Sequence, residues 1–283
     1  MVGPAARREA AAYLQQHHRF SQRRACRLLT LSRATARCIV RPNVDDAIRT
    51  RLRERAAQRP RFGYRRLTAL LRREHGPVNH KRVYRLYRAE GLQVVRRRRK
   101  RVAVCRGGAS HASTGPNQQW AMDFVHDTTA MGHTFRALTL VDTYTRECHG
   151  IEVARSLPSA RVIRVLEGLL PLYGRPERIR VDNGPEFISQ ALDQWATRLG
   201  IQLEFITPGK PMENGYIESF NGKFRDECVN QHWFTDRTDA RGLIEGWRCD
   251  DTMVRPHSAL GNQTPEDYAR RYREGAQALV TSG

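Results

Sequence analysis

The sequence has few acidic residues, no long apolar run and no paired cysteines. Its 283 residues carry 29 Asp and Glu against 49 Lys and Arg, which leaves a formal net charge of +20 at pH 7. No apolar stretch is long enough to span a bilayer, and no signal peptide opens the chain. The 6 cysteines form no CxxC pair, which argues against a zinc finger and against a disulfide framework. We therefore expect a cytoplasmic protein with no membrane partner.

The positive charge is concentrated in the first third of the chain. Residues 1–101 hold 29 Lys and Arg but only 6 Asp and Glu, whereas the remaining residues hold 20 and 23. A basic segment of this size repels itself unless phosphate groups neutralise it. The division predicts a nucleic-acid-binding region followed by a near-neutral globular body.

The basic region contains two helical blocks. Residues 1–43 hold short helical patterns around a tight connection, a weak helix-turn-helix signal, with Ser21 as a candidate N-cap. Residues 44–95 form a stronger helix-turn-helix-like block, in which Asn79 is a candidate N-cap and Gly91 a candidate stop. A helix that begins Asn-His-Lys-Arg suits insertion into a DNA groove. The alternative is a helical bundle whose arginines only face water. The candidate DNA contacts of this block are Arg65, Arg66, Lys81, Arg82 and Arg85.

A basic run and a linker separate this region from the rest of the chain. The side chains of RRRRKR would repel one another inside a packed element, so we expect this run to lie extended along phosphates or to be disordered. Its residues are Arg96, Arg97, Arg98, Arg99, Lys100 and Arg101. Turn-forming residues follow, and residues 96–118 together are the predicted basic run and linker.

Strand and helix patterns take over after the linker. In WAMDFV, residues 120–125, large apolar side chains alternate with small ones and with Asp123. FRALTLVDTYTR and CHGIEVA follow as two further strands of an antiparallel meander. Helix, strand, helix, strand and helix patterns come next, and the last of these helices contains YIESF. This order predicts an α/β core, a mixed sheet with flanking helices, over residues 119–275, with a tail at 276–283.

Three acidic residues stand where strands and a helix can bring them together. Asp123 lies inside a strand, Asp182 follows the strand RIRV, and Glu218 lies on a helix with 35 residues between it and Asp182. Enzymes that cut phosphodiesters commonly hold two divalent cations about 3.5–4 Å apart with carboxylates. An aspartate inside a short strand disfavours that strand and therefore needs a partner. The three acids are thus candidate ligands of Mg²⁺ or Mn²⁺.

Two of these acids, each taken alone, also have an ordinary structural explanation. Asp182 in Asp-Asn-Gly could cap a turn, and Glu218 could be an exposed helical residue. Asp142, Glu186 and Glu213 compete with them as ligands. The case for the three therefore depends on the set and on the sequence around it.

The surrounding sequence resembles a known family. WAMDFV, VDNGPEF, ITPGKPMENGYIESFNGKFRDEC and RPHSALGNQTPEDYA, in this order, look like the integrase-core transposases of bacterial insertion sequences, in particular the OrfB-type proteins with a DD-35-E set of acids. The likeness covers residues 117–270, and the block at residues 44–95 resembles that group's accessory helix-turn-helix. The resemblance implies an RNase-H-like fold of the retroviral-integrase superfamily. It also implies that Asp123, Asp182 and Glu218 are the catalytic residues and bind Mg²⁺ or Mn²⁺, with two ions in the site.

The resemblance implies further contacts around the acids. Asn183 and Gly184 would shape the turn that presents the second acid. Before RPH the family commonly carries Tyr-Asn, whereas this chain has Asp251-Thr252. This difference affects the contacts expected of the segment that leads to two candidate accessory residues, Arg255 and His257. For His257 the alternative is a side chain packed near the helix end. The DNA-binding residues implied near the acids are Asn183, Asn214, Asn221, Lys223 and Arg225.

The implied function is that of a DNA transposase. Metal-activated water would cut DNA at the end of an insertion sequence, and the freed 3′-OH would attack a second phosphodiester. The implied DNA partners are double-stranded DNA with terminal inverted repeats and the target DNA. The implied protein partners are further copies of the chain in a synaptic complex and an upstream OrfA product joined by fusion. The implied location is the bacterial cytoplasm, near the nucleoid. Two rival functions are a non-catalytic DNA-binding derivative or repressor, and an RNase-H-like hydrolase of RNA in hybrids.

Deleting residues 1–101 should flatten the salt dependence of DNA affinity, because the shortened chain releases fewer counterions on binding. The affinities of the full and shortened chains for one duplex, measured from about 50 to 200 mM salt, check this. An unchanged slope would show that the basic region does not touch phosphate.

Overall fold

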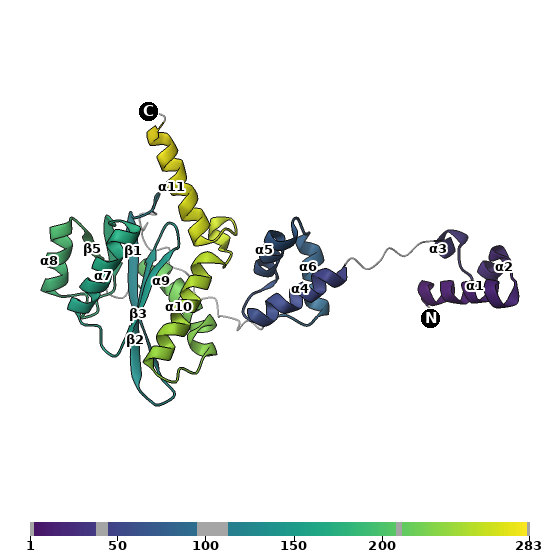
Figure 1. The fold of residues 1–283 in the computed structure, drawn as a ribbon, viewed down its shortest axis with the longest axis horizontal. Helices are drawn as coiled ribbons and strands as arrows, with labels where there is room; N and C mark the ends of the chain where they lie inside the picture. The colour runs from purple at the N-terminus through teal and green to yellow at the C-terminus, as the bar shows by residue number, and fades with distance from the viewer. Residues whose placement is uncertain (1–2, 38–44, 95–112, 208–210, 282–283) are drawn as a thin grey trace. The chain divides into compact units, whose positions relative to one another are not determined.

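The chain divides into two units, and the sheet belongs to the second (Figure 1). The computed structural model describes residues 3–37, 45–94, 113–207 and 211–281. The units are Met1–Arg51 and Leu52–Gly283, so the division falls inside a helix. The predicted basic run lies outside the described residues. The domain boundaries expected from the sequence stay predictions.

Short helices make up the first unit. They are α1 (Pro4–His18), α2 (Gln22–Leu28), α3 (Arg33–Arg37) and the start of α4 (Asp45–Gln58). Ser21 caps α2 as predicted, because its hydroxyl oxygen accepts a hydrogen bond from the Arg24 N–H at 3.3 Å. The buried side chains described in this unit are those of Ala11, Ala25 and Cys26. A core this small gives the unit little stability of its own.

A three-helix block opens the second unit. It consists of the remainder of α4, α5 (Tyr64–His75) and α6 (His80–Ala89), whose apolar faces bury Leu52, Leu71 and Leu86. Asn79 caps α6 as predicted, with its side-chain oxygen accepting from the Lys81 N–H at 2.9 Å. The chain turns away after α6 at Gly91, whose φ of 67° suits glycine.

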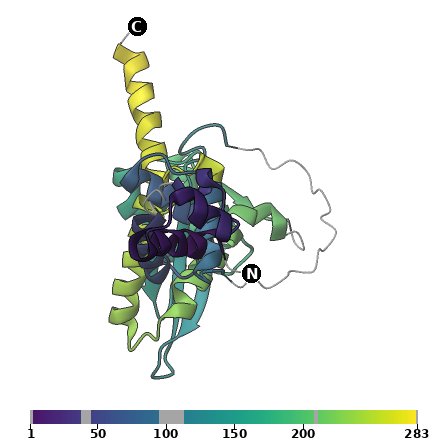
Figure 2. The same ribbon diagram turned by 90° about the vertical axis from the view of Figure 1, so that its right-hand side faces the viewer.

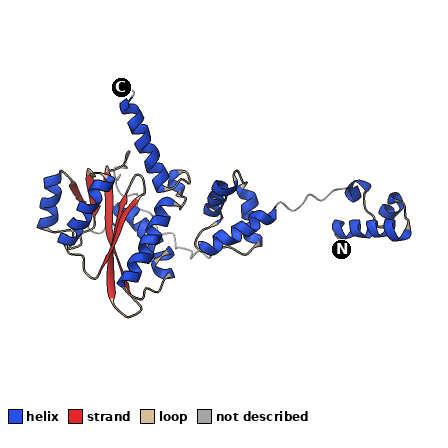
Figure 3. Ribbon diagram, viewed as in Figure 1, coloured by secondary structure: helices blue, strands red, loops and turns tan. Residues whose placement is uncertain are grey.

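A mixed five-stranded sheet forms the rest of the second unit (Figure 3). Its strands are β1 (Gln119–Thr128), β2 (Thr134–Asp142), β3 (Cys148–Ala154), β4 (Arg178–Val181) and β5 (Gln202–Phe205). They lie in the order β3-β2-β1-β4-β5. The first three are antiparallel, as the predicted meander requires, and β1, β4 and β5 run parallel.

Helices cover both faces of this sheet. They are α7 (Ser159–Tyr173), α8 (Gln190–Leu199), α9 (Gly215–Glu227), α10 (Arg237–Met253) and α11 (Pro265–Thr281), with short 3-10 turns η1 (Pro211–Asn214), η2 (Val229–Gln231) and η3 (Ser258–Leu260). The end of α11 extends beyond the other elements of its unit in both views (Figures 1 and 2). Among the described helices, none combines the length and the apolarity needed to cross a bilayer.

The two faces of the sheet carry separate apolar clusters. Trp120 and Met122 of β1 pack with side chains of α7 and α8, whereas Ala121 and Val125 pack with side chains of α9 and α10. This alternation follows from the two-residue period of a strand. Asp123 therefore shares the face that α9 covers, and the fold positions it against that helix.

Replacing Leu166 by alanine should lower the free energy of unfolding by about 2–5 kcal/mol, because its fully buried side chain on α7 would leave a cavity. Leu172→Ala on the same helix is the matched control. Its side chain is 72% exposed, so we expect a change below about 0.5 kcal/mol. Urea unfolding followed by tryptophan fluorescence measures both, since Trp120 and Trp195 lie in the affected cluster. Equal losses in the two variants would contradict the described core.

Candidate active site

Asp123 is held by a partner on α9. Its Oδ2 accepts a hydrogen bond from Asn221 Nδ2 at 2.8 Å, and its Oδ1 accepts from the Phe124 backbone N–H at 2.7 Å. The Thr139 hydroxyl of β2 donates to Asn221 Oδ1 at 2.9 Å, and Asn221 itself is buried. The strand aspartate thus has the partner that its position demanded. That partner comes from a helix nearly 100 residues later in the chain.

The register of the sheet brings the second acid beside the first. The parallel pairing of β1 with β4 sets Ala121 opposite Arg180. Continued by two residues, the same register sets Asp123 opposite Asp182, which directly follows β4. Neighbouring strands lie about 4.8 Å apart. The sheet itself therefore positions two carboxyl groups next to each other.

A tight turn presents Asp182 at the end of β4. The Gly184 N–H donates to Asp182 Oδ1 at 3.0 Å, and a side chain at Gly184 would place its Cβ 3.0 Å from the same oxygen. Glycine therefore leaves room for the carboxylate. Asn183 Nδ2 donates to the Ile206 carbonyl at 2.9 Å, which fixes the turn to the end of β5. Both residues of the predicted turn thus have a structural role there.

Glu218 completes the set from α9. It is exposed and precedes Asn221 by three residues, so both lie on one side of the helix. Burial raises the pKa of Asp123, and the negative charges of Asp182 and Glu218 raise it further, while the hydrogen bonds from Phe124 and Asn221 lower it. Asp182 and Glu218 are thus each close enough to Asp123 for their charges to repel its carboxylate.

Divalent cations fit this set by chemistry. The acids offer hard oxygen donors, which Mg²⁺ and Mn²⁺ prefer, and a bound cation would relieve their repulsion. Within the described residues, no cluster of three or more His, Cys, Asp and Glu side chains already has the arrangement of a metal site. Magnesium retains several waters and is held through few carboxylates, so a complete protein shell is not required.

The three competing acids are committed elsewhere. Asp142 accepts hydrogen bonds of 2.7–2.8 Å from three backbone N–H groups, two in the turn after β2 and one at Asn117 before β1. Glu186 forms an ion pair with Arg136, which lowers the pKa of that carboxyl. Glu213 accepts from the Thr207 N–H at 2.8 Å. Each of these contacts is structural, which leaves the other three acids as the candidate site.

The residues expected to bind DNA near the acids lie on different sides of α9. Arg225 is exposed, and its charge, after burial and Arg136, lowers the pKa of His126 on β1. Asn214 is buried at the start of the helix, and its Oδ1 has no hydrogen-bond partner in the described part of the chain. Lys223 is half-buried and faces a cavity shared with Arg255 and His257. The structure therefore groups Asn221 with the acids, places Arg225 close enough to His126 of β1 to act on it, and sets Lys223 apart.

The residues expected to bind DNA on the helical block are mostly at its surface. Arg65, Lys81 and Arg85 are exposed, and Arg82 is half-buried. Arg66 contacts the core instead, with its Nη1 3.5 Å from Glu227 Oε1. The residues of the basic run, 96–101, lie outside the described part of the chain.

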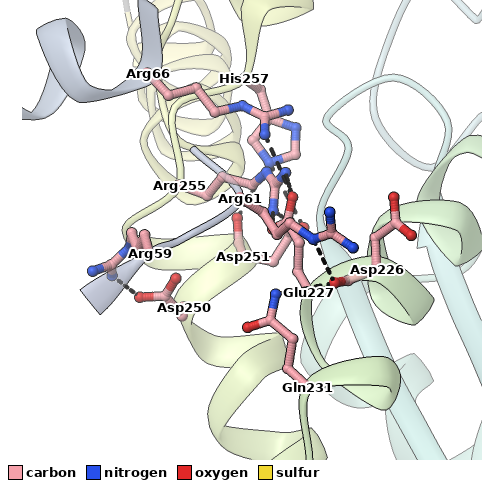
Figure 4. A network of polar contacts seen from close by, with 10 residues as sticks. All are labelled: Arg59, Arg61, Arg66, Asp226, Glu227, Gln231, Asp250, Asp251, Arg255 and His257. Atoms are coloured by element: carbon pink, nitrogen blue, oxygen red, sulfur yellow. Dashed lines mark hydrogen bonds and ion pairs between the residues drawn. The ribbon is translucent and has the colours of Figure 1, made fainter. Parts of the chain in front are cut away.

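A buried ionic cluster, which sequence reasoning missed, contains the two candidate accessory residues (Figure 4). The Arg255 side chain is 2% exposed; it pairs with Glu227 of α9 and lies 3.3 Å from Asp251 of α10. Arg66 reaches the same glutamate from the helical block, and Arg59 pairs with Asp250. The cluster therefore holds the α4–α5 connection against the ends of α9 and α10.

His257 is a packed member of this cluster. Its Nε2 lies 3.3 Å from the Asp251 carbonyl oxygen, and its backbone N–H donates to the Gln263 carbonyl at 2.9 Å. Burial and the charges of Lys223 and Arg255 lower the pKa of His257 to about 3. A ring that stays neutral at pH 7 is not a strong phosphate ligand, and the contacts favour the packed alternative.

Replacing His257 by glutamine should reduce the acid sensitivity of the fold. The unfolded chain protonates this histidine below about pH 6.5, whereas the folded ring stays neutral down to about pH 3. Protonation therefore favours the unfolded chain, and the wild type loses stability as the pH falls below about 6.5. From pH 8 to 5.5 we expect it to lose about 1 kcal/mol more than the variant.

Urea unfolding at the two pH values measures this difference. His133→Gln, at an exposed residue in the turn after β1, is the control and should keep the wild-type dependence. Identical losses in wild type and His257→Gln would show that the buried ring does not resist protonation.

Comparisons with known proteins agree with this geometry. Models described as an integrase core domain match residues 113–211 and 199–265, and a model described as an HTH-like domain matches residues 44–100. A chain of a simian T-cell lymphotropic virus intasome superposes with a TM-score of 0.51 and 19% identity, covering 77% of this chain and 74% of that one. At this identity the likeness shows the fold alone, which is the RNase-H-like α/β fold predicted from the sequence.

The sequence relatives belong to bacterial insertion elements. Transposase InsF for insertion sequence IS3A of Escherichia coli is 24% identical and covers 92% of this chain and 98% of its own. The 31.7 kDa protein of insertion element IS407 of Burkholderia multivorans is 48% identical over 260 residues, which cover 91% of this chain and 94% of the relative. Since nearly half of the residues are identical over almost the full length of both proteins, this chain belongs to the insertion-sequence transposases that join an HTH-like domain to an integrase core.

Proposed function

We propose that the protein cuts DNA at the ends of an insertion sequence and joins the freed 3′ ends to target DNA, and that Asp123, Asp182 and Glu218 are its catalytic residues. The geometry that supports the proposal is the convergence of three carboxyl groups from two adjacent strands and from a helix packed on their sheet, with Asp182 and Glu218 each close enough to Asp123 for their charges to act on it. Three acids gathered in this way suit a reaction that must neutralise the charge of a phosphodiester.

In this mechanism the chain supplies oriented oxygen ligands. Asn221 and the Phe124 N–H hold the Asp123 carboxylate, and the Gly184 N–H holds that of Asp182. Packing of α9 on the sheet fixes the approach of Glu218. When bound, Mg²⁺ or Mn²⁺, with two ions in the site, supplies Lewis acidity and lowers the pKa of a water molecule. No side chain is required as a covalent nucleophile.

The proposed partners follow from charge and from family. Double-stranded DNA, with terminal inverted repeats as the substrate, would lie along the exposed Lys81, Arg85 and Arg225. Salt-sensitive contacts of this kind supply most non-specific affinity. Because the viral relative is a component of an intasome, we propose that several copies of this chain act together on paired ends. Fusion to an upstream OrfA product and action in the cytoplasm complete the proposal.

Asp182→Asn should reduce metal-dependent nicking of a labelled inverted-repeat duplex by at least about 100-fold, since losing one charged ligand removes several kcal/mol of transition-state stabilisation. Asp193→Asn, an exposed acid on α8, is the matched control and should keep full activity. Duplex affinity measured in EDTA should be the same for both variants and the wild type. Product sizes on sequencing gels separate plain cutting from joining.

Two results would contradict the proposal. If the wild type binds the duplex but nicks it under neither Mg²⁺ nor Mn²⁺, with the upstream product supplied, the protein is a DNA-binding protein without catalysis. If it degrades RNA in hybrids and forms no joined DNA product, it is a hydrolase.

A further inference from the structure

A cavity of about 580 Å³ lies beside α9, apart from the three acids. Arg66, the end of β2, the turn after β2, α9 and the segment between α10 and η3 contribute to its wall. Its lining includes four cationic residues, one carboxylate and three hydroxyl groups, namely Arg66, Arg146, Lys223, Arg255, Glu213, Tyr216, Ser219 and Ser258. A space of this size is in the range of ligand pockets, about 300–1,000 Å³.

Helical geometry separates this cavity from the acids. At 3.6 residues per turn, each residue of α9 is rotated by about 100° from the one before it. Asn221 and Arg225 consequently fall within about 60° of Glu218. Lys223 falls about 140° away from Glu218, on the same side as Ser219. One helix therefore presents the candidate catalytic acid on one side and a lysine on another.

Two of the cations in the cavity have no carboxylate partner. Lys223 forms no hydrogen bond or ion pair with any residue that the structure describes, although the nearby Asp251 charge raises its pKa. The net pKa of Lys223 is lowered, mainly by burial and further by the charges of Arg255 and Arg66. The Arg146 guanidinium lies 3.9 Å from the centre of the Tyr216 ring and makes no ion pair within the described residues. Both cations are half-buried.

The other charges around the cavity are already paired. Arg66 and Arg255 share Glu227, and the Glu213 carboxylate accepts hydrogen bonds from Thr207. The Lys223 ammonium and the Arg146 guanidinium are partly removed from water, and neither contacts a carboxylate directly within the described residues. A phosphate group would supply the missing acceptors, since it can accept hydrogen bonds from both cations and from the hydroxyl groups beside them.

We propose that this cavity binds a phosphate group of the DNA backbone through the Lys223 ammonium and the Arg146 guanidinium. The proposal rests on DNA being the substrate, as proposed above. The bound phosphate is not the one that is cut, because Glu218 lies on a different side of α9. A strand held at this cavity is fixed to the same rigid helix that carries the third acid, so its scissile phosphate would be set at a constant distance from the site.

Duplex binding by the full chain in EDTA tests the proposal, because no cutting is needed for this measurement. Lys223→Gln and Arg146→Gln should each reduce the slope of log affinity against log salt by about 0.9, the value for one lost phosphate contact. Lys223→Arg should restore most of the slope. Arg198→Gln removes the same charge from an exposed site on α8, across the sheet from α9, and should leave the slope unchanged.

Thermal unfolding of each variant shows whether it is folded. If Lys223→Gln does not fold, the salt slope of Arg146→Gln decides the test. Slopes that match Arg198→Gln in both variants would overturn the proposal, whether or not the wild type cuts DNA. Conversely, reduced slopes in a protein that never nicks would support the phosphate contact and contradict only the proposed catalysis.

Inorganic phosphate distinguishes a DNA contact from a site for a free anion. We expect it to raise the unfolding temperature of the wild type more than that of Lys223→Gln, and to compete with the duplex. If phosphate stabilises only the wild type while the salt slopes stay equal, the cavity binds a free anion and the DNA contact is wrong.

Discussion

The candidate site depends on holding negative charges together against their own repulsion. Burial is the main cause of the raised pKa of Asp123, and repulsion by Asp182 and Glu218 raises it further. The opposing free energy comes from α9, whose fully buried Ile217 and Phe224 and nearly buried Phe220 pack on the sheet. Each such side chain contributes about 1.5–3 kcal/mol, so packing can hold Glu218 near the strand acids before any cation binds. The apolar side of one helix therefore makes the arrangement of the acids stable.

That helix also connects the site to the basic helical block. Glu227, in the last turn of α9, forms ion pairs with Arg66 of α5 and with Arg255 of the segment after α10. Burying these charges costs desolvation, which only their mutual pairing offsets. Ionic clusters of this kind favour one arrangement over its alternatives, because a displaced partner leaves a buried charge behind. The same α9 that carries the third acid is thereby held in a defined position by residues of the DNA-binding region.

The features that the sequence predicts well are the local ones. Strand alternation predicts the face on which Asp123 lies, and Ser21 and Asn79 sit where their side chains can cap a helix. The roles that were not predicted depend on contacts distant in sequence. Nothing near residue 221 indicates that its amide supports Asp123, and the pairing of Glu227 with Arg255 depends on how α9 meets α10. The helical period of α9 is enough to predict from the sequence that Lys223 and Glu218 lie on different sides of the helix.

Asp251, where the resemblance leads us to expect a tyrosine, is an acid whose charge this cluster has to balance. Asp251 is almost fully buried, with Arg255 3.3 Å away and no hydrogen bond to its carboxylate from any described residue. Burial raises its pKa, whereas the charges of Arg255 and Lys223 lower it. An acid at this position is thus sustained by two cations, one of which also faces the cavity. If a phosphate binds the cavity as proposed, it attracts Lys223 in competition with Asp251, so we expect the Asp251 charge to lower the affinity of the cavity for anions.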